Sequence, residues 1–148
     1  MARIDYGAIT QAIRDVIAGD PDVRKLDATV EIGAPVAVGF PFVGVYEGRR
    51  SLTAGQPLAV GTRTRYRVDW DVWVANFSGE SFADAASGRN ELLGYVEVAL
   101  MANRGLLGSV GNNSLMLQGG VLEGGRAEGG FIAQASLGLT VEVEATTG

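Results

Sequence analysis

The chain has 148 residues, of which 47% are hydrophobic and 20% charged, a composition typical of one folded domain and not of a disordered chain. Its net charge of −5 has the wrong sign for a protein that binds nucleic-acid phosphates over its whole surface. The chain contains no cysteine and no histidine, which excludes disulfides, thiolate zinc sites, cysteine nucleophiles and histidine-dependent triads.

The first twenty residues, MARIDYGAITQAIRDVIAGD, predict an amphipathic helix. Ile9, Ile13 and Val16 recur at helical spacing, and the breaker residues 19–21 end the pattern. Acidic residues interrupt the apolar stretch, so it does not resemble a signal peptide and we expect synthesis in a cytoplasm. The longest uncharged apolar run, residues 34–46, falls short of the roughly 20 residues of a membrane span, so no membrane anchor is expected.

The next part of the chain predicts two strands joined by a long loop. DPDVRKLD, residues 20–27, is interpreted as a turn, and PVAVGFPFVGVY, residues 35–46, as a strand with Pro41 at an edge or bulge. Residues 47–61 are rich in glycine and small polar residues, which favours a long, mobile connection. TRTRYRVDWDVWVANF, residues 62–77, alternates polar and apolar side chains and is the strongest strand signal in the chain.

The second half predicts a helix followed by two strands. Ser81 is expected to cap a helix that ends near residues 103–105. The apolar stripe of that helix contains Phe82, Ala85, Leu92, Leu93, Val96, Leu100 and Met101. Strands are expected at 114–117 and 133–144, with a glycine-rich loop at 118–130 between them. The order α-β-β-α-β-β predicts a single α+β domain, residues 1–148, with a mainly antiparallel sheet and two helices on one face.

Pairs of carboxylates are the nearest approach to a catalytic or metal-binding pattern. Asp69 with Asp71, and Glu142 with Glu144, share strand faces and have the chemistry for acid–base work or for holding a divalent cation. No motif places a nucleophile beside a base, so we interpret both pairs as solvated sheet surface. The glycine clusters between residues 119 and 130 lead into a strand and are followed by no lysine, unlike a phosphate-binding loop. We therefore expect no enzymatic activity, cofactor or metal.

A ladder of charge follows one face of the strand at 62–77. Arg63, Arg65 and Arg67 precede Asp69 and Asp71 at every second position. One interpretation is a solvated face paired with the glutamates of a neighbouring strand, and the other is an interface with another subunit. The two are compatible.

A single register between this strand and the closing strand satisfies both sheet faces. An antiparallel pairing can set arginine over glutamate on the polar face while aromatic and branched residues face each other in the core. The expected pairs are Arg65–Glu144, Tyr66–Val143, Arg67–Glu142, Val68–Val141, Trp70–Leu139 and Val72–Leu137. Asp69 and Asp71 then face Thr140 and Gly138 without a cation, so we expect them to point toward an arginine of a neighbouring subunit. The arginines considered for that contact are Arg89, Arg104 and Arg126.

The stretch RNELLGYVEVALMANRGLLGSV, residues 89–110, resembles the tail-terminator, or tail-completion, proteins of long-tailed bacteriophages. The shared features are a helix ending in AL, then NR, a leucine, a glycine and a valine, followed by a weak strand and a long closing strand. The first helix and the strand YRVDWDVWV fit the same order of elements, so the resemblance spans most of the chain. The glycine-rich tract from 119 to 130 departs from that pattern.

The resemblance implies a non-enzymatic virion protein at the head-proximal end of the tail. Its subunits would form a homo-hexameric ring that caps the tail-tube protein, ends tube polymerisation and offers a surface to the head connector. Arg49 and Arg50, expected near the tip of the 47–61 loop, would face the lumen or the tube. DNA would pass without specific binding, because each subunit brings a net charge of −5. The alternatives are a head-completion or neck protein of the same virion, and a small β-rich adhesin or binding module.

Overall fold

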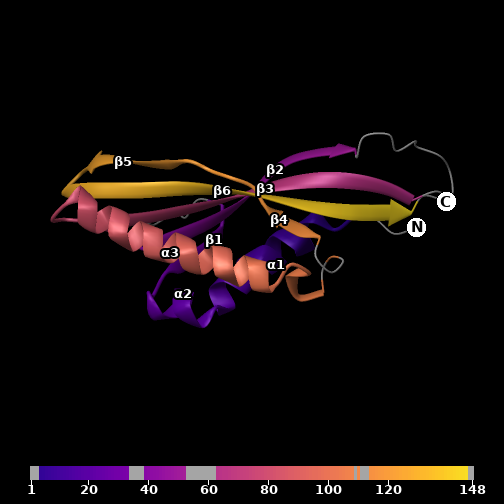
Figure 1. The fold of residues 1–148 in the computed structure, drawn as a ribbon, viewed down its shortest axis with the longest axis horizontal. Helices are drawn as coiled ribbons and strands as arrows, with labels where there is room; N and C mark the ends of the chain where they lie inside the picture. The colour runs from indigo at the N-terminus through magenta and orange to yellow at the C-terminus, as the bar shows by residue number, and fades with distance from the viewer. Residues whose placement is uncertain (1–3, 34–38, 53–62, 109, 111–113, 147–148) are drawn as a thin grey trace.

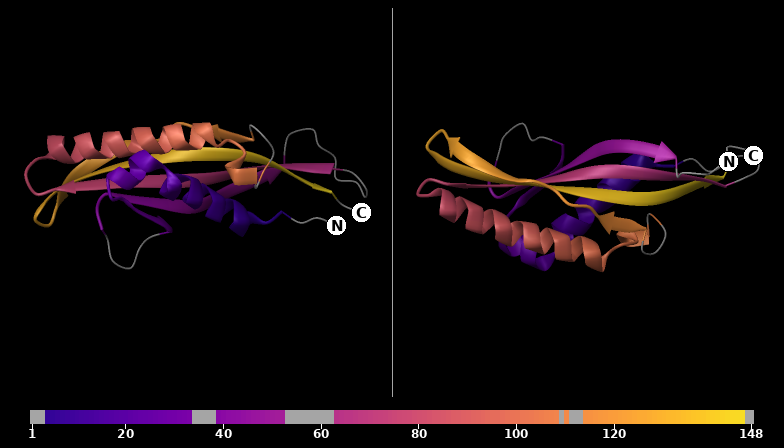
Figure 2. Two further views of the ribbon diagram at one scale, coloured as in Figure 1. Left: turned by 90° about the horizontal axis from the view of Figure 1, so that it is seen from below. Right: turned by 45° about the horizontal axis from the view of Figure 1, so that its top comes forward.

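The computed structural model describes residues 4–33, 39–52, 63–108, 110 and 114–146. Within these residues, the strands form one mixed six-stranded sheet, and three α-helices lie on one side of it (Figures 1 and 2). The predicted α+β class is confirmed. The sheet is mixed because its first strand runs parallel to its neighbour, whereas the other pairings are antiparallel.

The N-terminal helix is confirmed, and a second helix follows it directly. In α1 (Tyr6–Gly19) the side chain of Asp5 accepts a hydrogen bond from the Ala8 amide at 3.0 Å. In α2 (Pro21–Lys25) the side chain of Asp20 accepts from the amides of Asp22 and Val23. The prediction of a turn at residues 20–27 was therefore wrong. An aspartate cap followed by proline at the first helical position is itself a helix-start signal.

The long helix α3 (Phe82–Ala102) begins where predicted. Ser81 accepts from the Asp84 amide at 3.0 Å and caps the helix. Phe82 and Met101, assigned to the buried stripe, are instead 41% and 51% exposed. Met101 directly follows the buried Leu100, and a step of one residue rotates a side chain about 100° around a helix axis. A 3₁₀ turn, η1 (Leu106–Gly108), follows the helix.

The sheet order is β1-β2-β3-β6-β4, and β5 also pairs with β6. The strands are β1 (Thr29–Ile32), β2 (Phe42–Leu52), β3 (Arg63–Ser78), β4 (Leu115–Leu117), β5 (Leu122–Ala127) and β6 (Gly130–Thr146). The predicted order α-β-β-α-β-β lacks α2, β1 and β5. β1 has only four residues and too short an alternation to be recognised.

The predicted loop at 47–61 was wrong for its first part. β2 continues through Leu52, because its backbone pairs with β3 as far as Tyr66. Pairing of backbone groups does not depend on side-chain pattern, so a glycine- and arginine-containing segment can extend a strand. The rest of that predicted loop lies outside the described residues.

The predicted register between β3 and β6 is confirmed at each pair. Arg65 lies opposite Glu144 and Trp70 opposite Leu139, and Asp71 lies opposite Gly138. These two strands run nearly the whole length of the twisted sheet in Figure 1. Helices α1 and α3 cover one face of this sheet, and the core lies between them. Its largest fully buried side chains include Trp70, Ile13, Ile17, Leu92 and Leu100.

The predicted loop at 118–130 was wrong for its central part, because residues 122–127 form β5. β4 pairs Leu117 with Leu139, and β5 pairs Leu122 with Ala135. The outer strand thus advances five residues while β6 advances four, which is a β-bulge of one extra residue. The residues of β5 are almost all exposed, so the segment has no apolar alternation.

Gly120 lies in this bulge, directly against β6. A Cβ at this position would overlap the carbonyl oxygen of Ser136, whereas a Cβ at the adjacent Gly119 would meet nothing within 4 Å. We expect Gly120→Ala to destabilise the protein by about 2 kcal/mol, because the two strands must separate to admit the methyl group. Urea unfolding measures the change, with Gly119→Ala as the matched control. Equal unfolding midpoints for the two variants would contradict the close approach.

Candidate functional site

The side of the sheet opposite the helices carries the predicted charge ladder. This polar face contains Arg65, Arg67, Asp69 and Asp71 from β3 and Glu142 from β6. Arg65, Arg67 and Asp71 are exposed, and Asp69 and Glu142 are half-buried. For these five residues, the predicted shared surface is confirmed, whereas the side chains of Arg63 and Glu144 lie outside the described part of the structure.

The register places arginines opposite glutamates, but not every such pair forms an ion pair. Arg67 faces Glu142, yet among the described residues no ion pair joins their charged groups. Arg65 faces Glu144, whose side chain lies outside the described part of the structure. Exposed ion pairs contribute little, typically about 0–1 kcal/mol, so solvation of long side chains competes with pairing. This part of the ladder fits the interpretation of a solvated face.

The two aspartates of the ladder differ in their surroundings. Thr140 donates a hydrogen bond to Asp69 Oδ1 at 2.9 Å, so Asp69 is anchored within the chain. Asp71 lies between Tyr46 of β2 and Gly138 of β6. Its carboxylate has no hydrogen-bond or ion-pair partner within the described part of the chain. Of the two, Asp71 is the residue open to a partner molecule.

The three arginines predicted to meet those aspartates are placed very differently from one another. Arg89 is 6% exposed, and its Nη1 donates to the carbonyls of Glu123 at 2.9 Å and Gln134 at 3.2 Å. Arg104 donates from Nε to the carbonyl of Leu115 at 2.9 Å. Arg126 is exposed on β5. Arg89 is thus an internal tie between α3 and the β5–β6 pair, a role that its place on the buried stripe of α3 could have indicated.

Arg49 and Arg50 lie in β2 at a bulge and not at the tip of a loop. The pairing with β3 passes from Glu47↔Trp70 to Arg50↔Val68, so β2 contains one extra residue. Gly48 permits this, because a Cβ there would lie 2.7 Å from the Asp69 carbonyl oxygen. Since cross-strand partners share a face, Arg50 lies on the helix side with the buried Val68.

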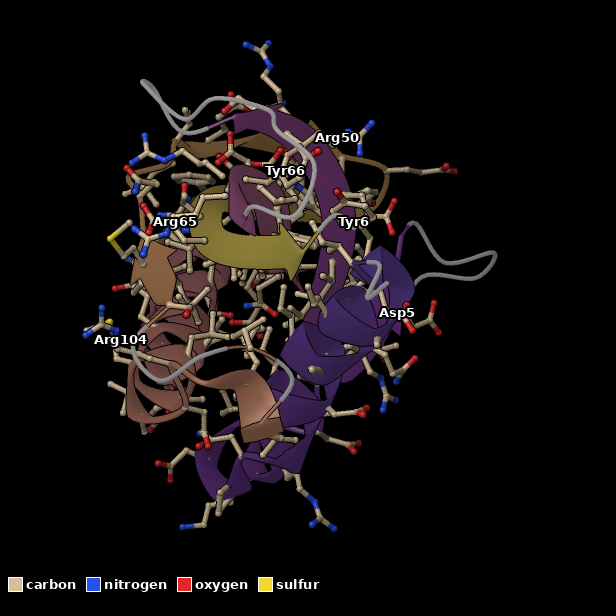
Figure 3. The ribbon with its side chains drawn as sticks, turned by 90° about the vertical axis from the view of Figure 1, so that its right-hand side faces the viewer. Asp5, Tyr6, Arg50, Arg65, Tyr66 and Arg104 are labelled. Atoms are coloured by element: carbon tan, nitrogen blue, oxygen red, sulfur yellow. The ribbon has the colours of Figure 1, made fainter. Side chains whose placement is uncertain are left out.

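Two tyrosines hold the Arg50 side chain. Its guanidinium carbon lies 5.8 Å from the ring centroid of Tyr6 and 5.9 Å from that of Tyr66, within the range of cation–π contacts. Arg50 Nη1 also donates to the Tyr6 hydroxyl at 3.1 Å. Figure 3 shows Arg50 and both tyrosines together at the end of the sheet, with Arg65 apart from them. The hydrogen bond to Tyr6 raises the pKa of the Arg50 guanidinium, which stays charged at physiological pH.

A pocket of about 310 Å³ opens beside Arg50. Its lining residues are Tyr6, Glu47, Gly48, Arg49, Arg50, Val68 and Trp70. Below it, Trp70 Nε1 donates to Thr10 Oγ1 at 2.9 Å, and the Thr10 hydroxyl lies 3.2 Å from Glu47 Oε1 and 2.9 Å from the Tyr6 carbonyl oxygen. The arrangement joins an aromatic and apolar floor to a positioned guanidinium, which suits a carboxylate better than a neutral polar group.

No known protein family matches this chain, and no curated protein is detectably similar to it. Among the residues that the structure describes, no three acidic side chains gather where they could hold a metal ion. None of the described helices is both long and apolar enough to cross a membrane. The candidate site is therefore defined by its own geometry: Asp71 on the polar face, and Arg50 with its tyrosines on the helix side.

Thr10 supports the floor of the pocket. Thr10→Val keeps the shape of the side chain and removes the acceptor of the Trp70 indole, leaving a buried N–H without a partner. We expect a loss of about 1–3 kcal/mol in the free energy of unfolding, measured in urea. Thr10→Ser, which retains the hydroxyl, is the control and should lose less. A Thr10→Val protein as stable as the serine variant would show that the hydrogen bond contributes nothing.

Arg89 is expected to hold β5 in place. Arg89→Met keeps an unbranched side chain but removes the donors to the Glu123 and Gln134 carbonyls. Amide hydrogen exchange in residues 122–127 should accelerate while α1 keeps its protection, because β5 has few apolar contacts of its own. Arg126→Met, at an exposed position of the same strand, is the matched control. Unchanged exchange in β5 after the Arg89 substitution would rule out this role.

Proposed function

We propose that this chain is a structural virion protein, a tail terminator that caps the phage tail tube as a homo-hexameric ring. The observation that carries the proposal is the uncovered polar face of the sheet, with a different charged site on the helix side. A closed ring is built from head-to-tail contacts, in which two different surfaces of each subunit meet. The resemblance at residues 89–110, a stretch that includes α3 from Arg89 onward and η1, supports the same proposal.

The ring would end tube polymerisation and form the surface that joins the head connector. Arg49, exposed at the β2 bulge, is the residue we propose to face the lumen or the tube. DNA would pass through without specific binding, since subunits with a net charge of −5 do not favour it. The protein would be made in the host cytoplasm and act in the virion.

We propose no enzymatic role and no cofactor. At the pocket, the Thr10 hydroxyl accepts a hydrogen bond from the Trp70 indole and lies 3.2 Å from the Glu47 carboxylate. These hydrogen bonds tie the first helix to the sheet. Because the buried Thr10 hydroxyl also accepts from the Trp70 indole, we interpret it as a structural group and not as a nucleophile activated by Glu47.

A head-completion or neck protein of the same virion is the nearest alternative, and a β-rich adhesin is a more distant one. An adhesin would present exposed aromatic residues to its ligand. Here, Phe42 packs against Trp73 with ring centroids 5.5 Å apart, and Phe40 stacks on Phe77 at 6.0 Å. Phe42 of β2 is fully buried and contacts Trp73 of β3, which favours a structural role for this pair, whereas Phe40, just before β2, is 37% exposed.

Tail length in a phage that lacks this gene tests the proposal. Loss of a tail terminator should give overlong tubes and tailless heads in electron micrographs, because nothing stops polymerisation. Added purified protein should restore tubes of uniform length that carry a ring at one end. Tubes of normal length that fail to join heads would instead identify a neck protein. Tails of normal length that are joined to heads would contradict both virion roles.

A further inference from the structure

Arg50 and Asp71 are two charged groups on opposite faces of the same pair of strands. Arg50 lies opposite Val68 on the helix side, and Asp71 lies opposite Gly138 on the polar face. Within the described residues, neither group has a partner of opposite charge. The sheet separates them, so they cannot meet inside one subunit.

Arg50 is prepared for a carboxylate. Its contacts with Tyr6 and Tyr66 restrain the side chain, and toward the described residues it donates one hydrogen bond, from Nη1 to the Tyr6 hydroxyl. A restrained guanidinium loses less side-chain entropy on binding, and its remaining donors match the two oxygens of a carboxylate. Glu47 lines the same pocket, but within the described residues no ion pair joins it to Arg50, and its Oε1 lies 3.2 Å from the Thr10 hydroxyl.

Asp71 is accessible and lies in a negative part of the polar face. Asp71 is exposed, and its neighbour on β6 is Gly138, which has no side chain of its own. Asp69, two positions away on the same face, adds a second carboxylate that is fixed by Thr140. Arg67 lies four positions away, beyond Asp69 and opposite Glu142. Charge complementarity therefore favours a cationic partner at Asp71.

We infer that Asp71 of one copy binds Arg50 of the next copy, in a front-to-back contact repeated around the assembly. A two-fold contact buries the same patch on both copies, and these two groups lie on opposite faces, so a single two-fold interface cannot bury both. Front-to-back contacts generate a ring or a filament. The inference rests on the homo-oligomeric part of the proposed function and goes beyond it by assigning the residues that join the subunits.

Exchanging the two charges tests this contact without any tail protein. Arg50→Glu and Asp71→Arg, each alone, place like charges at every contact, and assembly measured by analytical ultracentrifugation should weaken by about tenfold or more. An equimolar mixture of the two variants should restore assembly, because alternating copies again oppose Glu to Arg and Arg to Asp. Since six is even, a six-membered ring can alternate. The control is Arg24→Glu, an exposed residue of α2 outside both surfaces.

Three results would overturn the inference. The first is unaltered assembly of both single variants, and the second is a mixture that stays as dissociated as its components. The third is a wild-type chain that stays monomeric at every concentration. A short DNA duplex provides a further comparison. If the wild-type chain binds it, Arg50→Glu does not, and mixing the two variants fails to restore assembly, Arg50 binds phosphate instead. Restored assembly in the mixture together with uncapped tubes would reject the tail-terminator proposal while supporting the contact.

Cross-linking gives a second measurement that does not depend on charge reversal. The chain has no cysteine, so introduced cysteines are the only thiols. The double variant Arg50→Cys/Asp71→Cys, treated with a short bismaleimide, should give a ladder of covalent oligomers beyond the dimer. Each single-cysteine variant should give almost none, because like positions do not meet in a front-to-back contact. Dimers alone from the double variant, or efficient dimers from a single variant, would contradict the inference.

Discussion

The pairing of β3 with β6 is the constraint on which the rest of the structure depends. The two strands are long and have complementary faces, so a shift of one residue would set valines against charges. Once the register is set, alternate side chains from Val68 to Val74 and from Ala135 to Val143 form one continuous apolar surface for α1 and α3. The charged side chains of the two strands lie on the other face. β6 then serves as the template for β4 and β5, which pair along its outer edge.

Two bulges modify this regular sheet, and both require glycine. At Gly48 the backbone of β2 approaches the Asp69 carbonyl, and at Gly120 the outer strand approaches the Ser136 carbonyl. The first bulge changes which face the following residue occupies. It therefore places Arg50 on the helix side, in contact with the rings of Tyr6 and Tyr66. The second lets one outer strand change its alignment with β6. An extra residue in a strand thus decides where a functional side chain lies.

The roles of Arg89 and Arg50 differ because one side chain is buried and the other is exposed. Arg89 is buried and uses its donors on main-chain carbonyls, where removal of the charge would leave those carbonyls without their partner. Arg50 is exposed and restrained by aromatic rings, a combination that favours recognition of an external carboxylate. A head-to-tail assembly needs such restrained, outward groups on two different surfaces of each subunit. This relation between the sheet geometry and the charges underlies the proposed ring.

The sequence by itself determined the elements with strong periodicity: α1, β3, α3, β6, the Ser81 cap, the α+β class and the β3–β6 register. It did so because alternation at period two and the spacing of a buried helical stripe depend only on local order. It also predicted β4 and the first part of β2, whereas α2, β1, β5 and the end of β2 were found only in the tertiary structure. β5 and the end of β2 are strands because a neighbouring backbone pairs with them, and the place of Arg50 depends on a bulge and on Tyr6 from a distant helix. Contacts between residues far apart in the chain leave no periodic signal in either segment, so only the folded arrangement could reveal them.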